Sequence, residues 1–253
     1  MPVRGQVLCV APFNEEMNRS RSMVTLLACT LASQGWGTLL VDLHGTGDSA
    51  GDYEEARWDH WLADLQAAVQ WLDGQPGGCR VLWGIRLGAI LAAQLHARRA
   101  DADCALVLWQ PVVDGKLHLT QFLRVKIAAA MDLVNQPKLT TAGMRADFAA
   151  GRTVEVAGYA LHPALADALD AARLADHALP TGTRVLWLEQ GHGDNPELPP
   201  VSRSLLERWP GEGRLITTLL FAGPAFWQVH ERAVAPEIIE YTSAWLAGPG
   251  TAT

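Results

Sequence analysis

The chain of 253 residues lacks a long hydrophobic run: 49% of it is hydrophobic, yet no stretch approaches the roughly eighteen apolar residues that a membrane span needs. The first residues, Met1–Gln6, hold one arginine and no apolar segment, so we expect no signal peptide and a cytoplasmic location. The net charge is −7 and the basic residues are scattered, which argues against a nucleic-acid partner. The length suits one large domain, or a domain that carries an insertion.

Cysteine is scarce, with 4 residues and no Cys-x-x-Cys pair. Cys9 and Cys104 fall within or beside apolar segments, where a small buried thiol is the usual outcome. The histidines are scattered and lack the spacing of metal ligands. We therefore expect neither a metal nor another cofactor.

Short apolar runs alternate with helical patterns along the chain. Each run is rich in Val and Leu, as expected for strands that are covered on both faces. Apolar residues at helical spacing separate the runs, as at Trp58, Trp61 and Leu65. This alternation predicts an α/β fold with a mostly parallel sheet flanked by helices. The predicted strands are Gln6–Ala11, Thr38–Leu43, Arg80–Trp83, Ala105–Trp109, Arg184–Leu188 and Ile216–Phe221.

The interval Val112–Thr183 breaks this rhythm. It has about seventy residues, whereas a crossover between parallel strands needs only about a dozen. Leu119–Val134 is helical in pattern, and Arg152–Tyr159 could form a short extended segment. Because ligands in open α/β sheets bind at the carboxyl ends of the strands, a cap inserted there would shape a pocket. The predicted domains are a core of residues 1–111 and 184–247, a cap of residues 112–183 and a flexible tail of residues 248–253.

The segment Gly84–Gly88, with the sequence GIRLG, follows the third predicted strand and leads into the apolar helix Leu87–Leu95. A strand, a tight turn and a helix in this order form the context of the G-x-S-x-G nucleophile elbow of the α/β-hydrolase fold. The middle residue here is Arg86, whose guanidinium stays protonated at physiological pH and serves neither as a nucleophile nor as a base. The motif therefore predicts an α/β-hydrolase fold and argues against ordinary serine-hydrolase chemistry.

Two further loops stand where this fold would place them. Asp42–Ser49, with the sequence DLHGTGDS, forms a glycine-rich turn after the second strand, in which we expect Ser49 to be structural. Glu15, Glu16 and Asn18 follow the first strand, at the place of the oxyanion loop. Both loops support the assignment of the elbow.

The acid and the histidine of a catalytic triad also have candidates in the required order. Asp194 follows the fifth predicted strand, where a triad acid usually emerges, although it also begins a turn-like Asp-Asn-Pro segment. His230 follows the sixth strand, and its side chain faces either the pocket or solvent. The order of elbow, acid and histidine along the chain is thus retained, but the elbow carries Arg86 in place of the nucleophilic serine.

On these residues the chain resembles the α/β-hydrolase subfamily called exosortase A system-associated hydrolase 2, whose members accompany exopolysaccharide and protein-sorting (PEP-CTERM) loci in Gram-negative bacteria. The resemblance runs over nearly the whole chain, and it implies that Arg86 is no isolated exchange, since the subfamily tends to carry arginine there. It also implies an N-terminal β-hairpin, for which Met1–Gly5 is too short. The matching segments are Pro12–Arg21, Asp42–Gly51, Ala56–Asp64, Trp83–Ala89, Trp109–Arg124 and Phe221–Gln228.

The charge of Arg86 requires an anionic partner, because the N-terminus of a helix is already the positive end of its dipole. One possibility is an internal ion pair with Glu15, Glu16 or Asp194, which are all expected at the same end of the sheet. The other is an anionic ligand. The two possibilities are compatible.

Two functions therefore stay open. One is a hydrolase or acyl-transfer protein in which His230 or a carboxylate activates water while Arg86 holds an anionic substrate or an oxyanion. The other is a catalytically silent protein that binds a small acyl or anionic ligand in the same pathway; serine catalysis from Ser20 or Ser22 is a third, weaker option. The catalytic candidates are Arg86, Asp194 and His230, and the substrate-binding candidates are Glu15, Glu16, Asn18, Gln110, Trp109 and Trp227.

Overall fold

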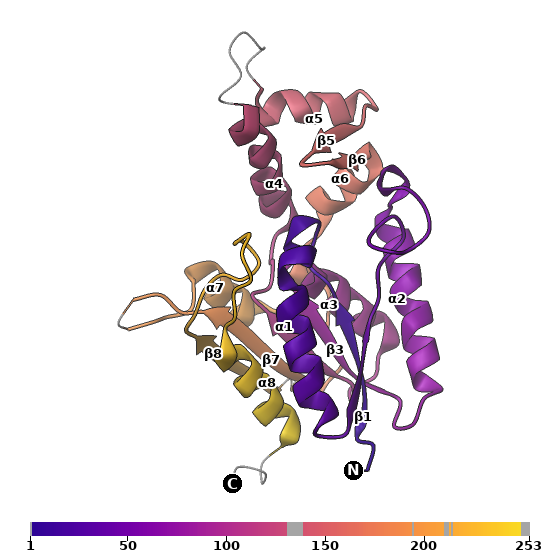
Figure 1. The fold of residues 1–253 in the computed structure, drawn as a ribbon, viewed down its shortest axis with the longest axis vertical. Coiled ribbons are helices and arrows are strands. Elements are labelled where there is room, and N and C mark those ends of the chain that lie inside the picture. Colours follow the sequence, from indigo (N-terminus) through magenta and orange to yellow (C-terminus); the bar gives the residue numbers. More distant parts are fainter. Residues whose placement is uncertain (1, 131–138, 194, 210–212, 214, 249–253) are drawn as a thin grey trace. The chain divides into compact units, whose positions relative to one another are not determined.

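The chain divides into two compact units, each assembled from segments that are far apart in the sequence. A computed structural model describes residues 2–130, 139–193, 195–209, 213 and 215–248 (Figure 1). The first unit comprises Met1–Val41, Leu65–Val113 and Leu174–Thr253, and the second comprises Asp42–Asp64 and Asp114–Arg173.

A parallel sheet of six strands forms the centre of the first unit, in the order β2-β1-β3-β4-β7-β8. The predicted α/β class and the parallel sheet are therefore confirmed, with strand ends that differ by a few residues from the predicted ones. The strands are β1 (Gly5–Val10), β2 (Trp36–Leu40), β3 (Cys79–Ile85), β4 (Ala105–Trp109), β7 (Arg184–Gln190) and β8 (Leu215–Phe221).

Helices cover both faces of this sheet. The helices α1 (Glu15–Ala32) and α8 (Pro236–Ala247) lie next to each other across one face (Figure 1), where they share a buried apolar cluster with alternate residues of the strands. The helix α3 (Gly88–Arg99) packs against β3 and β4, behind the sheet in this view. Buried apolar residues on both faces explain why the strands are hydrophobic throughout instead of alternating with polar residues. The remaining helices of this unit are α7 (Pro200–Arg208), the short η2 (Leu174–Asp176) and the last part of α2 (Trp58–Asp73).

The second unit contains a small antiparallel hairpin and several helices. The hairpin joins β5 (Val154–Val156) and β6 (Tyr159–Leu161), so the predicted extended segment Arg152–Tyr159 lies on it. The predicted helix Leu119–Val134 corresponds to α4 (Gly115–Ala130), and residues 131–134 lie outside the described residues. The other helices are η1 (Tyr53–Glu55), the start of α2, α5 (Thr141–Ala149) and α6 (Pro163–Ala171).

The interval that was predicted to be a cap thus forms compact structure of its own over Asp114–Arg173, together with Asp42–Asp64 from the preceding part of the chain. Its function as a cap stays a prediction. In the described part of the chain, no helix combines the length and the apolar character that crossing a membrane requires.

Candidate active site

Three residues with positive φ follow three neighbouring strands at their carboxyl ends. Asn14 (φ 51°) follows β1, Arg86 (φ 54°) follows β3 and Gln110 (φ 43°) follows β4. A left-handed conformation costs a non-glycine residue roughly 1–2 kcal/mol, and such strain concentrates at functional sites. The carboxyl end of the sheet is therefore the candidate site of the first unit.

The turn at Arg86 has the geometry that its two flanking glycines predict. A Cβ atom at Gly88 would collide with the carbonyl oxygens of Val10 and Ala11, and one at Gly84 would collide with the backbone of Ala89. The backbone N–H of Arg86 donates to the carbonyl of Trp109 at 3.0 Å, which ties the turn to the end of β4. A sharp strand-to-helix turn is thus present between β3 and α3, with an arginine at its tip, and its correspondence to a nucleophile elbow stays a prediction.

The guanidinium of Arg86 contacts three protein groups. Its Nε lies 3.2 and 3.3 Å from the two carboxylate oxygens of Glu16, and its Nη2 lies 3.2 Å from Oε1. Its Nη1 donates to the backbone carbonyl of Gln110 at 3.2 Å, and its Cζ lies 5.3 Å from the ring centroid of Trp227. Only 12% of the Arg86 side chain and 18% of the Glu16 side chain are exposed. Of the partners considered for Arg86, the structure therefore places the internal acid Glu16 against it.

Glu16 lies in an environment that opposes its ionisation. Burial raises the pKa of its carboxyl group, and the charge and hydrogen bonds of Arg86, followed by the charge of Arg19, lower this pKa less than burial raises it. Its position in the first turn of α1 favours the carboxylate, because the helix dipole is positive there. The carboxyl group of Glu16 therefore interacts electrostatically with two arginines, Arg86 and Arg19.

Arg19 extends this network to the surface. Its Nη1 donates to the carbonyl of Gln228 at 2.8 Å. Its Nη2 lies 3.5 and 3.4 Å from Nδ1 and Nε2 of His230, whose side chain is exposed. His230 therefore lies against a cation at the surface, and its pairing with an acid stays a prediction because Asp194 lies outside the described residues.

The remaining predicted side chains differ in their surroundings. Glu15 is half-buried and Asn18 is exposed, both on the first turn of α1. The side-chain oxygen of Gln110 accepts a hydrogen bond from the backbone N–H of Gln190 at 2.7 Å, so this residue joins the ends of β4 and β7. Trp227 is buried against Arg86.

Trp109 is a core residue, which corrects the prediction that it lines a pocket. Its side chain is fully buried, packs edge-to-face against Trp83 and Phe226, and donates from Nε1 to Thr242 at 2.9 Å. The physical reason is the alternation of side chains along a strand. It turns Trp109, like Trp83, towards the face of the sheet that α8 covers, where both belong to one buried apolar cluster.

Residues 2–187 match the family described as serine aminopeptidase, S33. The chain belongs to this family of α/β-hydrolases. Two solved structures are similar in fold: Est1E from Butyrivibrio proteoclasticus with bound ferulic acid (16% identity, TM-score 0.64, covering 96% of this chain and 88% of that one), and the monoacylglycerol lipase of Paleococcus ferrophilus (17% identity, TM-score 0.57, covering 98% and 95%). A search of curated proteins found no match.

Near the carboxyl end of the sheet of this α/β-hydrolase lies a buried acid that was not among the predicted site residues. Glu189, in β7, is only 2% exposed, and its Oε1 accepts hydrogen bonds from Trp187 Nε1 at 2.8 Å and from Ser202 Oγ. Burial raises its pKa, while these two hydrogen bonds and the charge of Arg86 lower it. The signal in the sequence was an acid that directly follows the apolar run Val185–Leu188 of β7.

Asn14 is the second residue that was missed. Its side chain is 6% exposed, and among the described residues neither its amide nitrogen nor its amide oxygen has a hydrogen-bond partner. A buried amide without partners indicates a water or a polar ligand at this position. It lies two residues before Glu16, in the loop that follows β1. In the described part of the chain, no group of three or more His, Cys, Asp or Glu side chains is arranged to hold a metal ion.

Proposed function

We propose that this α/β-hydrolase-fold protein binds a small acyl or anionic ligand at the carboxyl end of its sheet and forms no acyl-enzyme at the elbow. The observation that carries the proposal is the ion pair between Arg86 and Glu16 at the tip of the elbow. A protonated guanidinium has no lone pair that attacks a carbonyl carbon. The fold has retained the turn of a hydrolase and holds a fixed positive charge there.

Among the described residues, the hydrogen bonds of Arg86 leave two of its N–H groups without a protein partner. Its N–H groups include two on Nη1 and two on Nη2, and the protein takes Nε and one hydrogen of each terminal nitrogen. A ligand carboxylate or phosphate could bind the remaining hydrogens, or replace Glu16, whose carboxyl group is already disposed to protonate. The buried amide of Asn14 and the ring of Trp227 supply polar and apolar contacts for the rest of the ligand.

The wider context of this proposal comes from the resemblance of six chain segments to exosortase A system-associated hydrolase 2. On that ground we propose that the protein belongs to an exopolysaccharide or exosortase (PEP-CTERM) system. A cytoplasmic location stays the expectation from the N-terminal sequence. Residues 112–183 would then serve as the cap over the ligand. The ferulic acid bound to Est1E, which is a carboxylic acid, supports a ligand of this general class.

The experiment that tests the proposal combines covalent labelling with ligand binding. A fluorophosphonate probe should label no serine of the purified protein, and p-nitrophenyl esters should not turn over. The thermal stability should rise with octanoate or an acyl phosphate, since a ligand that binds only the folded state stabilises it. This rise should vanish in Arg86→Met and persist in Arg208→Ala, which removes an exposed positive charge from α7. Labelling of any serine in the wild type would contradict the proposal.

A hydrolase that activates water directly is the second candidate. It is favoured by Glu189, because a buried carboxyl group with a raised pKa is the usual form of a general acid or base, and the charge of Arg86 acts on it. Arg86 would then hold an anionic substrate group or a developing oxyanion. This candidate requires ester hydrolysis that resists the fluorophosphonate and disappears in Glu189→Gln. Activity that survives both Glu189→Gln and His230→Ala would exclude it.

A further inference from the structure

The strand β8 lies at one edge of the sheet (Figure 1) and lacks the charged residues and prolines that commonly protect an edge strand. Its seven residues are LITTLLF, and its register with β7 runs without a shift from Leu215 to Phe221. The opposite edge strand, β2, is shorter, with five residues, and Gly37 weakens it. Since an open edge presents backbone groups that another strand can pair with, β8 is a candidate interaction surface.

The hydrogen bonds at the two ends of β8 show which of its residues face β7. The N–H of Leu215 donates to the carbonyl of Thr183 at 2.9 Å, and the carbonyl of Phe221 accepts from the N–H of Gly191 at 2.9 Å. In a parallel pair, every second residue of a strand bonds to the same neighbour. The odd-numbered residues of β8 therefore bond to β7.

The even-numbered residues Ile216, Thr218 and Leu220 consequently turn their backbone N–H and C=O groups away from β7, towards the open edge. In the described part of the chain, no backbone group pairs with them on that side. Their side chains are half-buried and uncharged. The backbone donors and acceptors of these residues are thus available to another strand.

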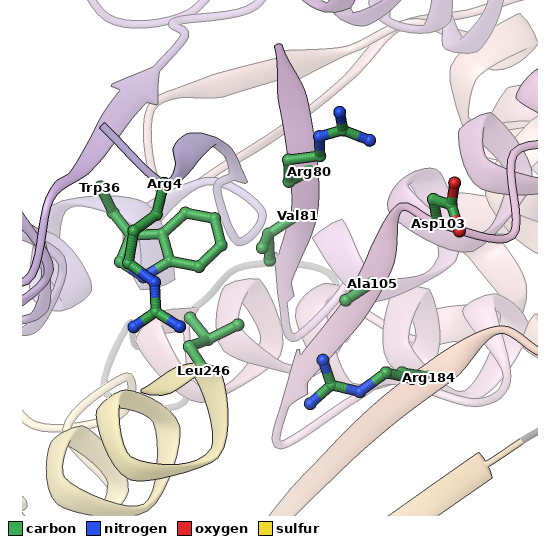
Figure 2. A pocket seen from close by; sticks show the side chains of 8 residues that line it. All are labelled: Arg4, Trp36, Arg80, Val81, Asp103, Ala105, Arg184 and Leu246. Carbon is green, nitrogen blue, oxygen red and sulfur yellow. The ribbon is translucent and has the colours of Figure 1, made fainter. Parts of the chain in front are cut away.

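A groove lies between β8 and the end of α8, with a volume of about 420 Å³. One of its walls is the ring of Trp245, which donates from Nε1 to Oγ1 of Thr217 at 3.1 Å. Arg184 extends from the start of β7 towards Leu246 of α8 (Figure 2), and its Cζ lies 4.3 Å from the ring centroid of Trp245. These contacts fix the wall of the groove and account for the position of Arg184. The lining residues are Arg184, Leu215, Thr217, Ala244, Trp245 and Gly248.

We propose that the open edge of β8 pairs with β8 of a second copy of this chain, in antiparallel orientation about a two-fold axis at Thr218. This register places Thr218 opposite Thr218 of the second copy, and Ile216 opposite Leu220 of the second copy. Every outward-facing residue of the strand then meets another one. In an antiparallel pair, two such residues exchange both of their N–H···O bonds. Threonine pairs and pairs of β-branched and apolar side chains across the two strands add to the stability.

The charge of the strand favours an identical partner. A two-fold axis brings residues of the edge close to their own copies, so a charged residue there would meet a like charge and weaken the pairing. The whole chain has a net charge of −7, and copies of an acidic protein repel each other unless they associate through an uncharged surface. β8 provides such a surface over its whole length.

The side chains on the face of α8 are also compatible with this register. Thr217 lies on that face, because it accepts the hydrogen bond from Trp245. In the proposed pair, Leu219 of the second copy lies opposite Thr217 and on the same face, next to the groove. The groove therefore offers space for an apolar side chain of the second copy.

Sedimentation velocity of the intact chain tests this proposal. At about 0.1 mM the wild type should be a dimer, since a micromolar Kd makes association almost complete at this concentration. Thr218→Lys should raise the Kd of the dimer at least about ten-fold, because two ammonium groups then meet at the axis. Thr218→Glu should do the same. An equimolar mixture of the two variants should form a heterodimer, which also shows that both variants are folded.

Thr38→Lys is the matched control, because it makes the same exchange at a half-buried threonine of the opposite edge strand, β2. Its dimer should have the Kd of the wild type. The proposal is overturned if the wild type is monomeric at about 0.1 mM, if Thr218→Lys leaves the dimer intact, or if Thr38→Lys weakens the dimer as much as Thr218→Lys does.

Amide hydrogen exchange locates the interface within β8. The N–H groups of Ile216 and Leu220 should be protected in the wild type and should exchange at least about ten-fold faster in Thr218→Lys, where the pairing is lost. Those of Thr217 and Leu219, which bond to β7, should stay protected in both proteins. Equally fast exchange of Ile216 in the two proteins would place any dimer interface elsewhere and overturn the proposal.

Discussion

Glu16, in the first turn of α1, binds the guanidinium of Arg86 through both Nε and Nη2, although the two residues are 70 positions apart in the sequence. This ion pair connects the loop after β1 to the elbow after β3. Because both side chains are largely buried, each charge depends on the other for compensation. The pair therefore contributes to the stability of the fold as well as to the electrostatics of the site.

Removing Arg86 should destabilise the protein markedly. Arg86→Met keeps much of the apolar volume of the side chain and leaves the Glu16 carboxylate buried beside Arg19 alone. We expect the free energy of unfolding at neutral pH to fall by about 3 kcal/mol, which is typical when one partner of a buried ion pair is lost. Chemical denaturation followed by tryptophan fluorescence measures this change.

A double-mutant cycle supplies the control. Arg86→Met combined with Glu16→Leu should cost clearly less than the sum of the two single replacements, since no isolated charge remains. Additive costs would mean that the two side chains do not depend on each other, and would contradict the ion pair.

The buried acid Glu189 predicts a pH dependence of stability. Its pKa in the folded protein is raised above the ordinary value of 4.5, so the folded state holds this proton more tightly than the unfolded chain. The stabilisation from this group is complete below pH 4.5 and is lost as the pH rises through the folded pKa. The glutamine of Glu189→Gln does not ionise, so this variant does not lose stability in this way. Its Tm minus that of the wild type should therefore increase as the pH rises from 4.5 through the folded pKa, and should then level off.

The control for this prediction is Glu207→Gln, an exposed acid on the same helix as Ser202. Its Tm difference from the wild type should change little with pH. If Glu189→Gln instead becomes progressively less stable than the wild type towards alkaline pH, the ionised carboxylate stabilises the fold and the prediction is wrong.

The fold followed from the sequence because the strands are covered on both faces and therefore carry apolar residues at nearly every position. The ends of the strands were harder to predict. The predicted strand Thr38–Leu43 stops at Leu40 in the structure, and Asp42 instead accepts a hydrogen bond from the backbone N–H of Asp48 at 3.0 Å. Apolar character alone does not distinguish the last residue of a strand from the first residue of such a turn.

The candidate site was only partly predictable. The contact between Arg86 and Glu16 could be predicted, because both follow strands whose carboxyl ends lie at the same edge of the sheet, and their functional roles stay predictions. Trp109 was misplaced, because its side-chain direction depends on which face of the sheet its register selects. Glu189 and Asn14 were missed, because their significance lies in burial, and burial of a single polar side chain leaves no periodic pattern in the sequence.

The hairpin between β5 and β6 offers a test of backbone strain in the second unit. Its two-residue turn consists of Ala157 (φ 52°) and Gly158 (φ 85°), and turns with two positive φ angles favour Asn-Gly. Ala157→Asn should therefore stabilise the protein by about 0.5–1 kcal/mol, as measured by chemical denaturation. The matched change Gly158→Ala should destabilise by about 1 kcal/mol, although no atom lies within 4 Å of the added Cβ. A neutral result for both would mean that the turn adopts another conformation.

Two similar Trp–Thr hydrogen bonds join strands to α8, and the one from Trp109 to Thr242 should contribute more to the stability of the fold. Both residues are almost fully buried, and Thr242 in turn donates to the carbonyl of Ile238 at 2.7 Å. Thr242→Val preserves the shape of the side chain but leaves the indole N–H without a partner in the core, which should cost about 1–3 kcal/mol.

The second pair, in which Trp245 donates to Thr217 at 3.1 Å, lies in a half-buried position and serves as the matched control. In Thr217→Val the indole N–H of Trp245 can still bind water, so the cost should stay well below that of Thr242→Val. Trp109→Phe combined with Thr242→Val separates the hydrogen bond from packing. The double variant has no unpaired indole N–H, so its loss of stability relative to Thr242→Val reflects the lost ring volume. The prediction assumes that a buried indole donor loses more when its partner is removed than an exposed one does. Equal losses in the free energy of unfolding for Thr242→Val and Thr217→Val would contradict it.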